Sequence, residues 1–145
     1  MRRMIMIACA LALAAIGLTR GQSSKPAQSD IVPMDKATVE HGRYIVHQVA
    51  MCVQCHTPRD ERGDLVMGRL LRGARMPVGS PFPRKEWCFE TPQIAGLPGW
   101  SDAEAVKLLM TGQDYRGYTP RPPMPPFRMT RQDAEAVVAY LRSLR

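Results

Sequence analysis

The segment CVQCH, residues 52–56, is the feature that most restricts what this 145-residue chain can fold into and bind. It places Cys52 and Cys55 three positions apart and sets His56 directly after the second thiol. Such a segment can be a redox-active dithiol, half of a zinc site, a short-range disulfide or an attachment point for haem. The surrounding sequence decides among these four interpretations.

Three of the four interpretations fit the surrounding sequence poorly. A thioredoxin-like dithiol follows a strand in a βαβ unit, and no strand pattern precedes Cys52. A structural zinc ion needs four ligands, yet the chain offers no second closely spaced pair, and its other candidate ligands are His56, His41, His47 and Cys88. His56 cannot easily join both cysteines of its own motif on one tetrahedral ion. A disulfide across two residues closes a small loop and adds little stability.

Haem attachment uses all three side chains of the motif. Two thiols three positions apart in a helical turn lie on one side, where they can add to the two vinyl groups at one edge of a porphyrin. The histidine that follows projects toward the ring centre and can ligate iron. The sequence therefore predicts one covalently attached haem c per chain, held by Cys52 and Cys55, with His56 as the proximal iron ligand.

Hydrophobic periodicity predicts an all-α fold. Helices are expected over about 36–50, 101–112 and 130–144, with Asp35, Ser101 and Thr130 as N-caps and Gly112 as a stop. CVQCH can continue the first helix, and residues 57–100 are expected to be loop with one short helix near 64–72. The prediction is a small domain of three main helices and long loops wrapped around covalent haem. Three short helices bury only a modest core at this size, which favours an added apolar cofactor.

The beginning of the chain has the pattern of an export signal. A short basic start precedes an uncharged apolar run of 14 residues, too short for a membrane span of about 20 residues. We expect residues 1–21 to be a signal peptide, with an uncleaved membrane anchor as the alternative. Residues 22–34 are expected to be a polar linker and residues 35–145 the folded domain. The protein is therefore expected in the bacterial periplasm.

The charge of the chain is only mildly basic. Loss of the signal would lower the formal net charge from +7 to +4, because Arg2, Arg3 and Arg20 leave with it. Such an excess can at most steer the protein toward an acidic partner. No stripe of interleaved basic and aromatic residues is present, and an exported protein rarely meets nucleic acid. Composition therefore argues against a nucleic-acid-binding function.

Several stretches of the sequence resemble a known family. GRYIVHQVAMCVQCHT and AEAVVAYLRSL, with a Met-Pro loop between them, are similar to the class I c-type cytochromes over about residues 36–145. GLPGWSDAEAVKLLMTG and YTPRPPMPPF are similar in particular to cytochrome subunits of membrane-bound bacterial dehydrogenases. The resemblance implies that the first and last helices cross, with Gly42 and Tyr140 at their contact.

A methionine is expected as the distal ligand, because a closed sixth position suits electron transfer and a sulfur ligand raises the potential. Met124 lies in TPRPPMPPF, where five of the seven residues 120–126 are proline. The fixed φ angles of proline stiffen such a loop, which can then hold a weak ligand in place. Its location just before the last helix also matches the class. Met76, Met129 and an open sixth site are the alternatives.

Other side chains have less definite assignments. The carbonyl that pairs with the His56 ring is left unassigned, because Pro58 comes early for the family and Pro77 and Pro81 lie beyond a longer insert. Cys88 is expected to be a small buried apolar side chain, with an intermolecular disulfide as the alternative. Candidates for the haem edge or propionates, each more often merely packed or solvent-facing, are Trp100, Tyr115, Tyr118, Arg121 and Arg128. The histidines expected at the surface are His41 and His47.

These expectations describe an electron carrier, and not an enzyme that makes or breaks covalent bonds in a substrate. Haem carries the electron, while the protein supplies binding, orientation and potential. Redox protein partners, a donor dehydrogenase and an acceptor cytochrome or oxidase, would dock transiently at the haem edge. The alternative function is a haem sensor or haem enzyme whose sixth coordination site is open or labile.

Overall fold

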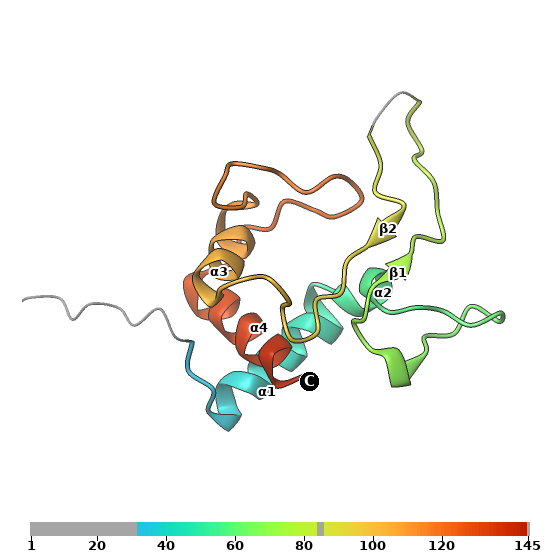
Figure 1. Ribbon diagram of the computed structural model, residues 1–145. Coiled ribbons are helices and arrows are strands. Elements are labelled where there is room, and N and C mark those ends of the chain that lie inside the picture. The colour runs from blue at the N-terminus through green and yellow to red at the C-terminus, as the bar shows by residue number, and fades with distance from the viewer. Residues whose placement is uncertain (1–31, 84–85, 145) are drawn as a thin grey trace, which may run out of the picture.

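The structure is a computed structural model, and it describes residues 32–83 and 86–144 (Figure 1). In chain order its elements are α1 (Lys36–Tyr44), the π-helical turn η1 (Ile45–Val49), α2 (Cys52–His56), the 3-10 turn η2 (Met67–Arg69), β1 (Ala74–Arg75), β2 (Glu90–Thr91), α3 (Asp102–Thr111) and α4 (Arg131–Ser143). The expected signal peptide, and all but the last three residues of the expected linker, lie outside the described residues. None of the described helices is both long and apolar enough to cross a membrane.

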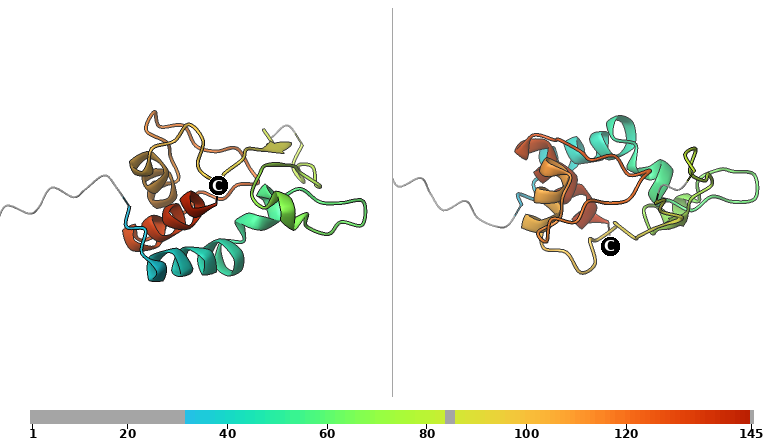
Figure 2. Two further views of the ribbon diagram at one scale, coloured as in Figure 1. Left: turned by 60° about the horizontal axis from the view of Figure 1, so that its bottom comes forward. Right: turned by 90° about the horizontal axis from the view of Figure 1, so that it is seen from above.

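Helices α1 and α4 lie side by side and cross in close contact (Figure 2). Gly42 is the buried residue of α1. A Cβ at this position would overlap the carbonyl oxygen of Ala136 and would lie 2.9 Å from the Cβ of Tyr140. Because the clash is with backbone, the crossing admits only glycine here. The expected contact between Gly42 and Tyr140 is confirmed.

Helix α4 is the most deeply buried helix of the described domain, and it packs against both α1 and α3. Most of its buried side chains are small or β-branched, which lets the other two helices approach closely. They are Ala134, Ala136, Val137, Val138, Ala139, Tyr140 and Leu141. The three predicted main helices therefore form one shared core.

Local sequence sets the ends of α3 and the start of α4. The Ser101 hydroxyl accepts a hydrogen bond from the backbone N–H of Glu104, whose carboxylate accepts one from the backbone N–H of Ser101 at 2.8 Å. This reciprocal pair is a capping box. Gly112 ends α3 with φ of 71°, and Thr130 caps α4 by accepting from the N–H of Asp133. The predicted caps and stop are confirmed.

The first helix ends before CVQCH, so the expectation that CVQCH could continue it is wrong. α1 widens into η1, where the N–H of Ala50 donates to the carbonyl of Ile45, five residues back. Met51 then takes φ of 54°, in the left-handed region. A left-handed residue cannot continue a right-handed helix. CVQCH therefore forms the separate helix α2 instead of continuing the first one.

The segment between α2 and α3 also differs in detail. The short helix expected near 64–72 is the single turn η2, and β1 pairs with β2 in an antiparallel ladder where no strand was expected. Residues 76–83 and 86–89, here called the arm, project away from the helices (Figure 1). Strands of two residues have no alternation that a sequence pattern could reveal.

Candidate haem site

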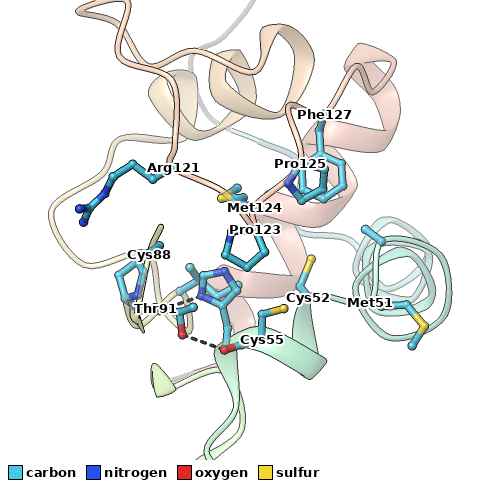
Figure 3. A pocket seen from close by; sticks show the side chains of 14 residues that line it. Met51, Cys52, Cys55, Cys88, Thr91, Arg121, Pro123, Met124, Pro125 and Phe127 are labelled. Atoms are coloured by element: carbon cyan, nitrogen blue, oxygen red, sulfur yellow. Dashed lines mark hydrogen bonds between the residues drawn. The ribbon is translucent and has the colours of Figure 1, made fainter. Parts of the chain in front are cut away.

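A cavity lies between α2 and the strap, residues 120–127, which precedes α4 (Figure 3). The space, including the solvent at its opening, is about 650 Å³, and its wall is mainly apolar. Cys52 and Cys55 project toward it from α2, and Met124 faces it from the strap between Pro123 and Pro125. The motif and the proline-rich loop, far apart in the sequence, thus border one space.

A second hollow of about 820 Å³ adjoins the first. Its wall is mainly apolar and includes Ile94, Leu97, Trp100, Ala105, Leu108, Leu109, Tyr118 and Leu141. His56 and Met124 line both hollows. Pro92 and Ile94 line both as well, so these four residues lie at the junction of a two-part cavity that reaches from α2 to α3.

His56 is 7% exposed and has a fixed ring orientation. Its Nδ1 donates a hydrogen bond to the carbonyl oxygen of Pro92 at 2.8 Å, because that oxygen can only accept. Burial lowers the pKa of His56, and the Pro92 carbonyl partly opposes that shift. The ring is therefore neutral at pH 7, and Nε2 keeps a lone pair for a metal. The carbonyl left unassigned by the sequence belongs to Pro92, and not to Pro58, Pro77 or Pro81.

The backbone of the motif is tied to β1 and β2. The Thr91 hydroxyl donates to the carbonyl of Cys55 at 2.8 Å (Figure 3). The N–H of Gly73 donates to the carbonyl of His56 at 2.9 Å. Each bond satisfies a carbonyl at the end of α2, where no further helical turn is available to do so. The small ladder therefore fixes the position of the motif beneath the cavity.

The first thiol of the motif, that of Cys52, lacks the lowered pKa of a reactive dithiol. Burial raises the pKa of the Cys52 thiol to about 11, whereas reactive dithiols depend on a lowered pKa. No disulfide joins the described cysteines, Cys52, Cys55 and Cys88. Within residues 32–83 and 86–144, no group of three or more His, Cys, Asp or Glu side chains could hold a metal ion. The raised pKa of Cys52 therefore does not favour a redox-active dithiol.

Two of the described methionines line the cavity, Met124 and Met51. Met51 is 45% exposed and directly precedes Cys52, so it cannot reach the opposite face of a bound ring. Met76 lies in the arm, where its N–H donates to the carbonyl of Phe89. Met129 packs against the hydrophobic core. Of the three methionines weighed as the distal ligand, the structure brings only Met124 to the cavity.

The other candidates from the sequence divide into two groups. Trp100 and Tyr118 line the second hollow and Arg121 lines the first. Tyr115 is exposed, with the guanidinium of Arg116 4.7 Å from its ring centroid. Arg128 donates to the backbone carbonyl beside it, that of Phe127, at 2.7 Å. Only the first group can therefore contact a molecule in the cavity.

The expectations for Cys88 and His47 are wrong. Cys88 is half-buried, lines the cavity, and its Sγ donates to the carbonyl of Glu90 at 3.0 Å. His47 is half-buried between helices and shares a 2.7 Å hydrogen bond with the hydroxyl of Tyr140. His41 is exposed as expected and pairs with Asp133. The cavity-lining residues that the sequence did not reveal include Thr91, Pro92, Ile94 and Phe127, because no local signal marks them.

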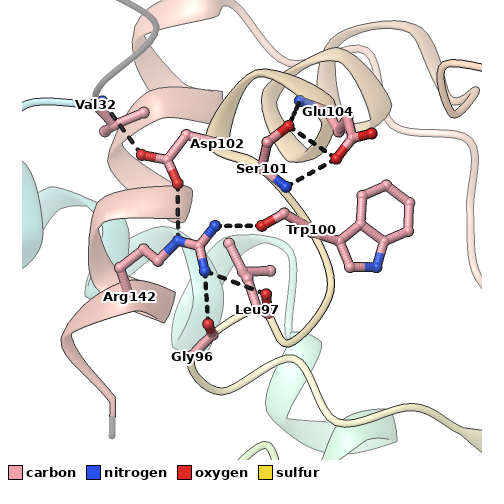
Figure 4. Close-up of polar contacts among 8 residues, drawn as sticks. All are labelled: Val32, Gly96, Leu97, Trp100, Ser101, Asp102, Glu104 and Arg142. Carbon is pink, nitrogen blue, oxygen red and sulfur yellow. Dashed lines mark hydrogen bonds and ion pairs between the residues drawn. The ribbon is translucent and has the colours of Figure 1, made fainter.

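Arg142 joins α4 to the loop that walls the second hollow (Figure 4). Its guanidinium forms an ion pair with Asp102 at 2.8 Å. It also donates to the carbonyls of Gly96 at 2.7 Å, Leu97 at 3.2 Å and Trp100. One cation therefore satisfies three loop carbonyls and the first residue of α3.

We expect Arg142→Met to lower the free energy of unfolding by about 2–4 kcal/mol, because half-buried acceptors lose a charged donor. The side chain of Arg142 is 27% exposed, which limits solvent compensation. Arg131→Met is the matched control, because Arg131 is 52% exposed and pairs only with Glu135, a contact worth about 0.5 kcal/mol or less. Urea unfolding followed by circular dichroism measures both. Equal losses in the two variants would show that the loop contacts of Arg142 contribute little.

Comparison with known proteins agrees with this geometry. The sequence model of the family described as cytochrome c matches residues 39–145. The fructose dehydrogenase cytochrome subunit of Gluconobacter japonicus is 32% identical over 108 residues, which cover 71% of this chain and 21% of that subunit. The chain therefore spans about a fifth of the length of this relative. With its attachment motif beneath a cavity and a match over most of its length, the chain belongs to the cytochrome c family, which implies covalent haem c and electron transfer.

Proposed function

We propose that this protein is a monohaem electron carrier of the bacterial periplasm. One haem c would be joined to Cys52 and Cys55, with His56 and Met124 as its axial ligands. The observation that carries the proposal is that these four side chains border a single cavity, although they come from α2 and from the strap. No bond-making catalysis is part of the proposal.

The residues present fit such a group. α2 is little more than one helical turn, so its two thiols lie on the same side of the helix. His56 offers Nε2, because Nδ1 is bound to Pro92, and this arrangement fixes a ligating ring. Both hollows are largely apolar and both are lined by His56 and Met124, so they would suit an apolar ring held by these two side chains. When bound, haem supplies a one-electron iron couple.

The strap leaves Met124 little freedom. Its prolines restrict φ on both sides of the methionine. Before Met124, the carbonyl of Pro122 accepts a 2.7 Å bond from the N–H of Cys88. After it, the N–H of Met129 donates to the carbonyl of Leu109 at 3.1 Å. A thioether anchored on both sides supports a closed sixth position, which favours a carrier over a sensor or an enzyme with an open site.

The proposed location and redox partners of the protein are supported by its sequence and by its relative. The signal-like residues 1–21 support export, and covalent haem attachment belongs to the exported compartment. An uncleaved segment would anchor the domain to the membrane instead. The name of the Gluconobacter relative supports a dehydrogenase as electron donor, with a cytochrome or oxidase as acceptor. Such partners bind transiently over small interfaces.

A haem stain of a denaturing gel tests covalent attachment. We expect the protein exported from a haem-attaching host to stain, and the Cys52→Ala/Cys55→Ala double variant to lose the stain. Cys88→Ala is the control, because Cys88 also lines the cavity but lies outside the motif; it should stain like the wild type. An unstained wild-type band would contradict the proposal.

A further inference from the structure

An open hollow of about 610 Å³, including solvent space, shares the side chain of Thr91 with the wall of the haem cavity. Its wall carries the exposed side chains of Arg69, Arg72 and Arg75, and we call it the arginine hollow. Thr91 lines both this hollow and the cavity. The arginine hollow therefore borders the haem cavity at Thr91.

The charge of these three arginines is not neutralised within the described part of the chain. No carboxylate there pairs with any of their guanidinium groups. The described Arg59, Arg116, Arg121 and Arg128 also lack a carboxylate partner, whereas Arg43, Arg62, Arg131 and Arg142 each have one. What distinguishes Arg69, Arg72 and Arg75 is that all three line one hollow. Glu90 also lines the hollow and lies opposite Arg75 in the β1–β2 ladder, yet it forms no ion pair there. Three positive charges and one negative charge leave a local excess of positive charge.

The arginine hollow is also firmly attached to the haem-binding motif. Gly73, between Arg72 and β1, has φ of 86°, and its N–H is bonded to the His56 carbonyl. A Cβ on Gly73 would lie 2.8 Å from the carbonyl oxygen of Thr91, so this approach requires glycine. The backbone that carries Arg72 and Arg75 is thus held in place by its hydrogen bond to the motif. A preorganised charged surface loses less entropy on binding than a mobile one.

We propose that the arginine hollow is the docking surface for a carboxylate-rich surface of a redox protein partner. The guanidinium fork matches carboxylates in a bidentate geometry, and arginine is enriched in protein interfaces. Unneutralised charge next to the haem cavity would steer such a partner to the place where electron transfer is short. The inference deepens the proposed function and rests on it.

Small redox probes of opposite charge test the local field. Ferricyanide takes one electron from the ferrous protein and becomes ferrocyanide. At low salt, we expect Arg69→Gln/Arg72→Gln/Arg75→Gln to slow this oxidation about tenfold. The same variant should speed oxidation by the cationic tris(phenanthroline)cobalt(III), which is reduced to cobalt(II). Both differences should fade near 1 M salt, where the Debye length is about 3 Å.

The matched control removes the same charge elsewhere. The variant Arg43→Gln/Arg116→Gln/Arg131→Gln also loses three positive charges, at residues that line neither the cavity nor the arginine hollow. We expect its rates to stay close to those of the wild type. Equal effects in the two triple variants would overturn the proposal, because net charge alone would then explain them. An unchanged haem spectrum in each variant separates this failure from failure of the proposed function.

Binding of a short oligoglutamate peptide tests docking directly. In the haem-loaded protein, we expect the peptide to shift the backbone amide resonances of residues 69–75 and 90–91. These shifts should be absent at high salt and in the Arg69→Gln/Arg72→Gln/Arg75→Gln variant. Inorganic phosphate is the second probe. Shifts elsewhere would overturn the proposal, and so would equal shifts by phosphate, which would indicate a site for small anions in place of a protein surface.

Discussion

Met124→Ala is expected to abolish the weak long-wavelength sulfur–iron absorption band of the oxidised, haem-loaded protein. Methionine sulfur favours reduced iron, so the reduction potential should also fall. We expect a decrease on the order of 0.1 V, a fraction of the roughly 0.8 V that axial ligands span. The protein should stay folded, because Met124 is only half-buried and lies on the strap, outside the helical core. Absorption spectra and a redox titration measure both effects.

Two further variants separate the competing ligands. Met76→Ala and Met129→Ala should both keep the band, since neither side chain lines the cavity. A band that survives in Met124→Ala and disappears in Met76→Ala would show that the ligand assignment is wrong. Carbon monoxide distinguishes the carrier from a sensor or enzyme. We expect the reduced wild type to bind it poorly and Met124→Ala to bind it readily, whereas ready binding by the wild type would favour the open-site alternative.

Gly42→Ala is expected to cost about 2–3 kcal/mol of unfolding free energy, even though alanine is the better helix former by about 1 kcal/mol. The new methyl group would overlap the carbonyl oxygen of Ala136 in α4. A backbone oxygen within a buried helix cannot rotate away, so α1 and α4 must separate. Gly42→Leu should fail to fold. Urea unfolding of the haem-loaded protein, followed by circular dichroism, measures the loss.

Gly68→Ala provides the control for this loss. Gly68 lies in η2, and a Cβ there would meet no atom within 4 Å. The unfolding free energy of Gly68→Ala should therefore stay within about 0.5 kcal/mol of that of the wild type. A Gly42→Ala protein as stable as Gly68→Ala would mean that the helix crossing tolerates a side chain.

The features that the sequence predicted are those set by neighbouring residues. The Ser101–Glu104 capping box and the Gly112 stop act within a few positions, so both ends of α3 were correctly placed. The Thr130 cap likewise placed the start of α4. Met124 could be singled out because its prolines are adjacent to it in the chain. Gly42 and Tyr140 could be paired only through the family resemblance, since their contact spans most of the domain.

The features that the sequence did not predict depend on contacts between distant segments. Pro92 carries no local sign that its carbonyl accepts from the His56 ring, 36 residues earlier. The left-handed Met51 breaks a helical pattern that its own side chain would allow. Cys88 lines the cavity because its backbone is bonded to the carbonyl of Pro122 in the strap. Such positions emerge only when the whole chain is folded.

The carboxylate of Asp102 couples two segments that are far apart in the sequence. One of its oxygens accepts from the backbone N–H of Val32 at 3.4 Å, and the other pairs with Arg142 at 2.8 Å. Loss of this one carboxylate would therefore weaken the attachment of the segment before α1 and of the end of α4 together. Local opening at the start of the described domain is thereby linked to local opening at its last helix.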